Sequence, residues 1–127
     1  PNEREVRIAL QDRETGLELL SQRLLEITRS TRLLMKLGAQ GFIAYDRTGM
    51  GPTVSQPFPA LSVNPVDVAG AGDSLLAVMA TGLASGQPMM STAALGCCMA
   101  ALAVETLGNT PISIETLRAG VLEALDL

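Results

Sequence analysis

The spacing of apolar residues predicts two helices at the start of the chain. One apolar side chain recurs every three or four positions across residues 16–29, which is the repeat of an amphipathic helix. Thr15 and Glu18 have the spacing of a capping box, so the helix is expected to begin after Thr15. A shorter helix is expected over residues 2–11. The apolar stripe of the longer helix consists of Leu17, Leu20, Leu24 and Ile27.

Two short apolar runs then predict strands. Residues 32–38, "RLLMKLG", end in a glycine and have the length and composition of a buried strand. Residues 41–46, "GFIAYD", form a second expected strand, and the tight turn from Gly38 to Gly41 joins the two. Residues 47–53 are expected to be a loop. Residues 54–66 are expected to be an irregular edge segment, because prolines interrupt them.

From residue 71 onward the pattern predicts helices. They are expected over 71–84, from Pro88 to about Leu107 with Gly108 as the stop, and over 113–126. The middle helix is dense in small residues, five alanines and Gly96, which permits close approach either to another helix or to a flat ligand. Helix, strands and then helices predict an α/β fold whose sheet is too small to stand alone.

Composition and charge narrow the classes of function. The 127 residues fit one domain, 47% are hydrophobic and only 2% are aromatic. The net charge is −4 and no basic run occurs, so nucleic acid is not an expected partner. The chain has no histidine, which excludes Ser-His-Asp and Cys-His catalysis and histidine-bound zinc. Carboxylates, backbone dipoles, Lys and Arg, or a metal held by oxygen must therefore supply any chemistry.

Cysteine usage and hydropathy point to the cytoplasm. Cys97 and Cys98 are adjacent, and neighbours on a helix are poorly placed to bridge each other, so reduced thiols are expected. No signal peptide opens the chain. The longest apolar run, residues 93–104, is shorter than the roughly 20 residues that a membrane span needs.

Residues 67–74, "DVAGAGDS", are the strongest candidate for a functional site. A glycine turn that enters a helix exposes backbone N–H groups and favours anions. Asp73 would repel a phosphate, but it fits a site in which a hydroxyl loses its proton while attacking a bound phosphoryl group. The alternative is an ordinary acid in the first turn of a helix. The P-loop pattern fails because no lysine follows Lys36, and the dinucleotide G-x-G-x-x-G pattern fails because Leu75 holds its last position.

Four sequence elements, in order, resemble the ribokinase/PfkB family of sugar kinases. "DVAGAGD" matches the family's D-[TV]-x-G-A-G-D, and the opening "PNERE" matches P-N-x-x-E. "KLGAQG" is similar to [TK]-L-G-x-x-G, and the small-residue helix ending in "ETLGNT" is similar to the family's penultimate helix. The resemblance covers nearly the whole chain. It implies the C-terminal, nucleotide-binding portion (residues 1–127) of a three-layer α/β/α kinase domain, without the N-terminal half, the lid and most of the sugar pocket.

The resemblance also implies catalytic roles. Asp73 would be the general base that deprotonates the acceptor hydroxyl. The backbone amides of Gly70, Ala71 and Gly72 would form the anion hole for charge on the transferred phosphoryl group. ATP would be the co-substrate and a sugar or sugar phosphate the acceptor.

Metal and nucleotide contacts follow from the same resemblance. Asn2 and Glu5 would order Mg²⁺ and its waters, and Asp67 with the carbonyl of Ala69 would lie near a monovalent cation such as K⁺. A helix cap and a surface acid are the alternative roles for Asn2 and Glu5. Core packing is the alternative for the α-helical Cys97 and Met99. The residues implied on the nucleotide side are Asn2, Glu5, Lys36, Gly38, Gly41, Cys97, Met99, Ala100 and Gly108.

Val68 stands where the family more often has threonine, as in some heptose-phosphate kinases. With "GNTPIS" and Glu115, this favours the kinases of bifunctional heptose synthases. The rival hypotheses are a non-catalytic nucleotide- or sugar-binding module, an inactive fragment of the same fold, and a plain structural domain. The high apolar content also makes pairing into a homodimer, through a sheet edge or an apolar face, a hypothesis.

Overall fold

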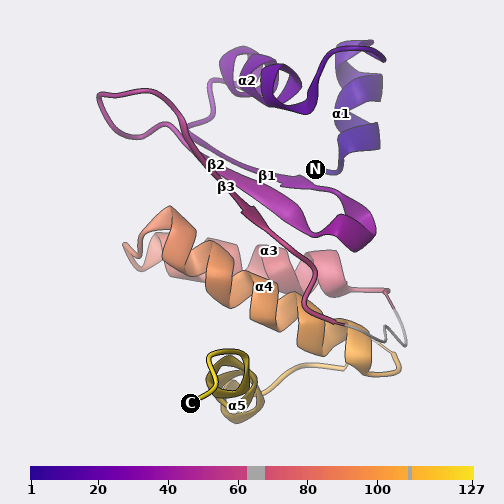
Figure 1. The fold of residues 1–127 in the computed structure, drawn as a ribbon, viewed down its shortest axis with the longest axis vertical. Helices are drawn as coiled ribbons and strands as arrows, with labels where there is room; N and C mark the ends of the chain where they lie inside the picture. Colours follow the sequence, from indigo (N-terminus) through magenta and orange to yellow (C-terminus); the bar gives the residue numbers. More distant parts are fainter. Residues whose placement is uncertain (63–67, 109) are drawn as a thin grey trace. The chain divides into compact units, whose positions relative to one another are not determined.

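The computed structural model describes residues 1–62, 68–108 and 110–127. The chain divides into two compact units, Pro1–Pro59 and Ala60–Leu127, and each is described by itself. The first unit contains the sheet and two helices, and the second contains three helices (Figure 1). The predicted change from mixed helix and strand to helix is therefore confirmed.

The first unit is a three-stranded antiparallel sheet with two helices. In chain order it has α1 (Glu3–Leu10), α2 (Leu17–Thr28), β1 (Arg32–Lys36), the 3₁₀ turn η1 (Gly38–Gln40), β2 (Phe42–Asp46) and β3 (Val54–Phe58). The strand order is β1-β2-β3, so β2 lies in the middle. Leu33 pairs with Tyr45 and Lys36 pairs with Phe42, which places η1 at the Lys36 end of the hairpin.

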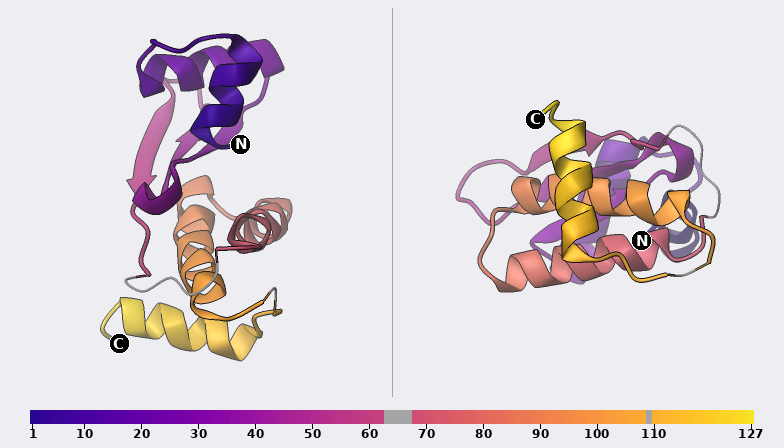
Figure 2. Two further views of the ribbon diagram at one scale, coloured as in Figure 1. Left: turned by 90° about the vertical axis from the view of Figure 1, so that its right-hand side faces the viewer. Right: turned by 90° about the horizontal axis from the view of Figure 1, so that it is seen from below.

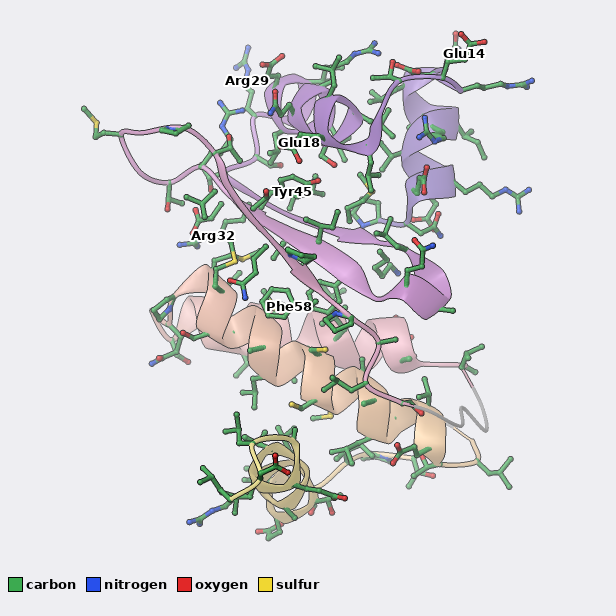
Figure 3. All side chains as sticks on the ribbon, in the orientation of Figure 1. Glu14, Glu18, Arg29, Arg32, Tyr45 and Phe58 are labelled. Atoms are coloured by element: carbon green, nitrogen blue, oxygen red, sulfur yellow. The ribbon has the colours of Figure 1, made fainter. Side chains whose placement is uncertain are left out.

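The sheet has two different faces because side chains alternate along each strand. One face packs against α1 and α2 in an apolar core. Tyr45 stands on this face, and Phe58 stands on the other (Figure 3). On that second face the rings of Phe42 and Phe58 stack with their centroids 5.1 Å apart, because β2 and β3 pair these two residues. The buried core beneath the helices consists of Val6, Leu20, Leu25, Leu33, Met35 and Tyr45.

Two local predictions in this unit are wrong. The capping box expected of Thr15 and Glu18 is absent: α2 has Gly16 as its N-cap, without a side-chain cap bond. Thr15 is not available as a cap, because its backbone and hydroxyl both donate to Asp12. Residues 63–66 of the segment expected to be an irregular edge lie outside the described residues. The described part lies at an edge of the sheet, but its residues 54–58 form the regular strand β3. Pro57 is tolerated there since β3 pairs, within the described residues, on one side only, with β2.

The second unit packs three helices: α3 (Ala71–Ala84), α4 (Met89–Glu105) and α5 (Ile114–Ala124). The first matches the predicted bounds, and Pro88 precedes α4 as its N-cap. α4 ends at Glu105, two residues before the expected end, because Thr106 has an extended backbone. Gly108, the expected stop, lies beyond it in a left-handed conformation with φ of 74°.

Small residues let α3 and α4 approach each other closely. A Cβ atom on Gly82 would stand 2.4 Å from Cγ2 of Thr92, and a Cβ atom on Gly96 would stand 2.6 Å from Cδ1 of Leu75. α5 crosses α4 (Figure 2). A Cβ atom on Gly120 of α5 would stand 3.1 Å from Cδ1 of Leu102 on α4. Helix packing therefore accounts for the glycine of α4. No helix in the described residues is long and apolar enough to cross a membrane.

Candidate functional site

The glycine turn before α3 presents backbone amides and a carboxylate together. Gly70 is the N-cap of α3, in a left-handed conformation with φ of 79° and without a side-chain cap bond. Ala71, Gly72 and Asp73 then form the first helical turn, whose N–H groups precede any intrahelical acceptor. The first bond that closes runs from Ser74 N–H to Gly70 O, at 2.9 Å. These amides carry the positive end of the helix dipole, so the turn is suited to an anion.

Asp73 lies in the same turn and is exposed to solvent. The carboxylate is therefore within one helical turn of the amides that would hold an anion, and it is accessible to a second reactant. Of the predicted cation ligands, Ala69 lies in the turn before Gly70. Asp67 lies outside the described residues.

Asn2 and Glu5 form a reciprocal cap at the start of α1. Asn2 N–H donates to Glu5 Oε2 at 2.7 Å, and Glu5 N–H donates to Asn2 Oδ1 at 2.8 Å. The capping role that the sequence left as an alternative is thus present. It fixes one carboxylate and one amide oxygen side by side at a helix N-terminus.

This pair of oxygens fits Mg²⁺ through water better than by direct coordination. Mg²⁺ takes six oxygen ligands and usually keeps several waters when one or two carboxylates and a phosphate bind it. Among residues 1–62, 68–108 and 110–127, no three acidic, cysteine or histidine side chains gather as a metal site. Asn2 and Glu5 therefore suit an ion whose direct ligands are waters and phosphate oxygens, with the two side chains holding the waters.

The turn at the end of β1 lies beside this cap. Lys36 N–H donates to Pro1 O at 2.9 Å, and Asn2 forms an isolated parallel bridge with Lys36. Gly38 and Gly41 have φ of 62° and 92°, positive values that glycine adopts without steric cost, so the tight turn favours glycine at both positions. Asn2, Lys36 and Gly38 line one open hollow of about 1450 Å³. The structure thus brings together the predicted residues of the first unit.

The remaining predicted residues belong to the second unit. Cys97 is buried on α4, and burial raises the pKa of its thiol, so it fits the core role that the sequence left open. Burial also raises the pKa of Cys98, and neither cysteine forms a disulfide. Met99 and Ala100 are partly buried on the same helix.

Sequence inspection missed a polar cluster around Asp12, in the turn between α1 and α2. Its carboxylate accepts bonds from Glu14 and Thr15 and forms an ion pair with Arg23. The bonds from Thr15 lower the pKa of Asp12 to about 2. The local signal is the aspartate three residues before a threonine, a pattern typical of side-chain-stabilised turns.

Comparison with known proteins gives a family match and related sequences. Residues 1–117 match the model of the pfkB family carbohydrate kinases. The chain is 41% identical over 73 residues to a bifunctional protein HldE of Trichlorobacter lovleyi, covering 58% of this chain and 14% of the relative. It is 31% identical over 121 residues to the bifunctional protein HldE of Syntrophotalea carbinolica, covering 92% of this chain and 24% of the relative.

Solved structures share the fold. Phosphofructokinase-2 from Escherichia coli matches with a TM-score of 0.81 and 19% identity, over 100% of this chain and 40% of its own. Ribokinase from Thermotoga maritima matches with a TM-score of 0.79 and 24% identity, over 95% of this chain and 40% of its own. The predicted ribokinase-like α/β fold is confirmed.

The chain spans about a quarter or less of the length of these curated relatives and about two fifths of these solved kinases. The family match nevertheless covers all four motifs that the sequence presents. This chain belongs to the pfkB family of carbohydrate kinases.

Proposed function

We propose that this chain is the C-terminal, nucleotide-side part of an ATP-dependent kinase that phosphorylates a hydroxyl of a sugar or sugar phosphate. The family match and the fold support this proposal. The chain spans only 24% of the HldE relative of Syntrophotalea carbinolica and 40% of the solved phosphofructokinase-2. We therefore propose that further residues of the complete kinase supply the rest of the acceptor pocket. The chain alone is therefore expected to be inactive, and its reduced cysteines fit a cytoplasmic enzyme.

The observation that carries the mechanism is the glycine turn at the start of α3. There, Asp73 directly follows the backbone amides of Gly70, Ala71 and Gly72. In the proposed reaction Asp73 accepts the proton of the acceptor hydroxyl as its oxygen attacks the γ-phosphorus of ATP. The bond from that phosphorus to the bridging oxygen breaks, and ADP leaves. The amides of Gly70, Ala71 and Gly72 would stabilise the charge on the transferred group, because fixed dipoles need no reorganisation during the reaction.

Asn2 and Glu5 would hold the waters of Mg²⁺, which when bound neutralises charge on the phosphates. Lys36, Gly38 and Gly41 would lie on the nucleotide side. This placement is supported by the backbone pairing of Pro1 and Asn2 with Lys36, which puts Asn2 beside the end of β1.

A monovalent cation near Asp67 and Ala69 is a further part of the proposal. It is supported by the sequence motif, and the E. coli phosphofructokinase-2 has been solved in complex with potassium. Cys97, Met99 and Ala100 remain proposed neighbours of the adenine, and Gly108 remains a proposed residue of the nucleotide side, on the strength of the motif resemblance alone.

For the acceptor we propose a heptose phosphate. Val68 and the "GNTPIS" segment resemble heptose-phosphate kinases, and the curated relatives described above are bifunctional HldE proteins. Pairing of two copies is also proposed. A tetrameric form is known for the E. coli phosphofructokinase-2.

Substitution of Asp73 in the protein expressed from its complete reading frame tests the mechanism. Asp73→Asn is expected to lower kcat about 100-fold or more, because a positioned general base contributes that much, and to leave the Kd for ATP nearly unchanged. Asp126→Asn serves as control, since Asp126 is exposed near the C-terminal end and has no proposed role. A wild-type kcat in Asp73→Asn would show that the assigned role is wrong. Absence of any phosphoryl transfer by the wild-type protein, with ATP still bound, would favour a non-catalytic binding module.

A further inference from the structure

We propose that Asp12 is a positioning residue that sets where α1 presents Asn2 and Glu5 to the nucleotide. Asp12 does not belong to the four family motifs and lies at the opposite end of α1 from Asn2. The inference rests on the proposed function, because it concerns the magnesium role assigned there to Asn2 and Glu5.

The carboxylate of Asp12 organises the turn between the two helices. Its Oδ1 accepts the backbone N–H groups of Glu14 at 3.2 Å and Thr15 at 3.0 Å. Its Oδ2 accepts the hydroxyl of Thr15 at 2.6 Å and pairs with the guanidinium of Arg23 on α2. The side chain of Asp12 is 12% exposed and that of Arg23 is 42% exposed, so solvent screens part of this ion pair and the hydrogen bonds from Glu14 and Thr15 are the main bonds of the carboxylate.

Arg7 ties α1 to the same turn. Its Nη1 donates to the carbonyl oxygen of Thr15 at 3.0 Å, and its Nη2 pairs with Glu3 at 2.8 Å. Asp12 N–H in turn donates to the carbonyl oxygen of Arg7 at 3.0 Å. α1 is therefore bonded to the turn through Arg7, and α2 is bonded to it through Arg23. Asp12 contacts both the turn and α2.

Apart from this turn, α1 has few anchors. Of its eight residues, all of them described, Val6 alone is buried, and Leu10 packs partly buried against the same core. Before the helix, Lys36 N–H donates to Pro1 O at 2.9 Å and Asn2 forms a bridge with Lys36. The helix is about 12 Å long at 1.5 Å per residue. If its C-terminal end is no longer held, the helix can rotate, and that rotation moves the oxygens of Asn2 and Glu5 at its N-terminal end.

The experiment compares Asp12→Ala with wild type in the protein expressed from its complete reading frame. Binding of Mn²⁺ with ATP is followed by electron paramagnetic resonance, and hydrogen exchange is followed at the backbone amides of Asn2 and Glu5. Asp12→Ala is expected to weaken Mn²⁺·ATP binding about tenfold, the usual effect of losing a residue that orients a metal's ligands. Exchange at those two amides should become faster. In assays, KM for Mg·ATP should rise while kcat at saturation stays near wild type.

Asp46→Ala is a matched control. The carboxylate of Asp46 also accepts a backbone N–H and a hydroxyl from one threonine, Thr48, at 2.9 and 2.6 Å. It also faces an arginine, Arg32, at 3.9 Å. It lies at the end of the sheet away from Lys36, so its loss should leave Mn²⁺·ATP binding and exchange at Asn2 and Glu5 unchanged.

The outcomes separate the inference from the function on which it rests. Asp12→Asn keeps an acceptor for the N–H groups of Glu14 and Thr15 but loses the charge opposite Arg23, so its loss of Mn²⁺·ATP affinity should be smaller than that of Asp12→Ala. If Asp12→Ala does not fold, Asp12→Asn is the variant that tests the proposal. Equal binding and exchange in the Asp12 and Asp46 variants would overturn the positioning role. Glu5→Gln distinguishes the two claims. If Glu5→Gln weakens Mn²⁺·ATP binding and Asp12→Ala does not, the positioning role alone is wrong. If neither variant weakens binding, the magnesium role of Glu5 is wrong as well.

Discussion

Asn2 and Glu5 each accept a hydrogen bond from the other's backbone N–H group, at 2.8 and 2.7 Å. The same two residues are proposed above to order magnesium. A cap and a metal site usually compete as explanations for such a pair. Here the cap fixes the rotamers of both side chains and uses Asn2 Oδ1 and Glu5 Oε2, so Glu5 Oε1 is the side-chain oxygen of the pair that the cap does not use.

Substitutions at Asn2 separate these two roles. Asn2→Ala removes the cap acceptor and should lower the free energy of unfolding by about 1 kcal/mol. Asn2→Ser keeps an acceptor for Glu5 N–H, because serine is a good N-cap, and should stay within a few tenths of a kcal/mol of wild type. Urea unfolding measures both. If Asn2 also orders magnesium, calorimetry should show weaker Mg·ATP binding in both variants; normal binding in a stable Asn2→Ser protein would leave Asn2 as a cap only.

Gly70→Ala tests the turn before Asp73. With φ of 79°, Gly70 holds a left-handed conformation that costs alanine roughly 1–2 kcal/mol. The backbone is expected to shift toward an ordinary φ and to carry the first-turn amides out of place, so kcat of the complete protein should fall together with stability. Gly49→Ala is the control, since open space surrounds Gly49. A Gly70→Ala protein with lower stability and wild-type kcat would contradict an anion hole in this turn.

Gly82→Ala tests the packing of α3 on α4. The new Cβ atom would stand 2.4 Å from Cγ2 of Thr92, which is buried and whose hydroxyl donates to the carbonyl oxygen of Pro88 at 2.9 Å. Overpacking of this kind costs about 1–3 kcal/mol, more than the roughly 1 kcal/mol that alanine gains over glycine in a helix. Thermal unfolding should show a lower Tm. A higher Tm would contradict this prediction, because it would mean that α3 and α4 can shift apart enough to accommodate the new Cβ atom without losing stability.

Asp12 should make stability depend on acid pH. Its pKa in the folded protein is about 2, below the usual 3.8, because Thr15 bonds to the charged form. The unfolded chain therefore binds the proton more tightly. The stabilising contribution is complete above about pH 4 and is lost as the pH falls through about 2. Unfolding measured between pH 5 and 2 should be steeper for wild type than for Asp12→Asn, and carboxyl NMR should place the midpoint near 2. Parallel curves for the two proteins would refute the assignment.

The sequence predicted most helices well and the ends of elements less well. The bounds of α3 match because Gly70 and the apolar repeat of residues 71–84 are local signals. The capping box at Thr15 failed for a competing reason: Asp12 already binds the Thr15 hydroxyl. The prolines predicted an irregular edge segment over residues 54–66. The edge position is correct, but residues 54–58 form a regular strand, because an edge position tolerates Pro57.

By itself the sequence determined the four motifs, the family, and the order of the helices and the first two strands, because these depend on residues within a few positions of one another. Tertiary structure decided which side chains meet. Only the folded chain shows Lys36 N–H bonded to Pro1 O, Gly82 against Thr92, and Asp12 joined to Arg23. Contacts between residues distant in sequence follow from packing and strand register, which no local pattern specifies. In this protein the sequence motifs identify the residues of the candidate site, and the tertiary contacts determine the positions of those residues.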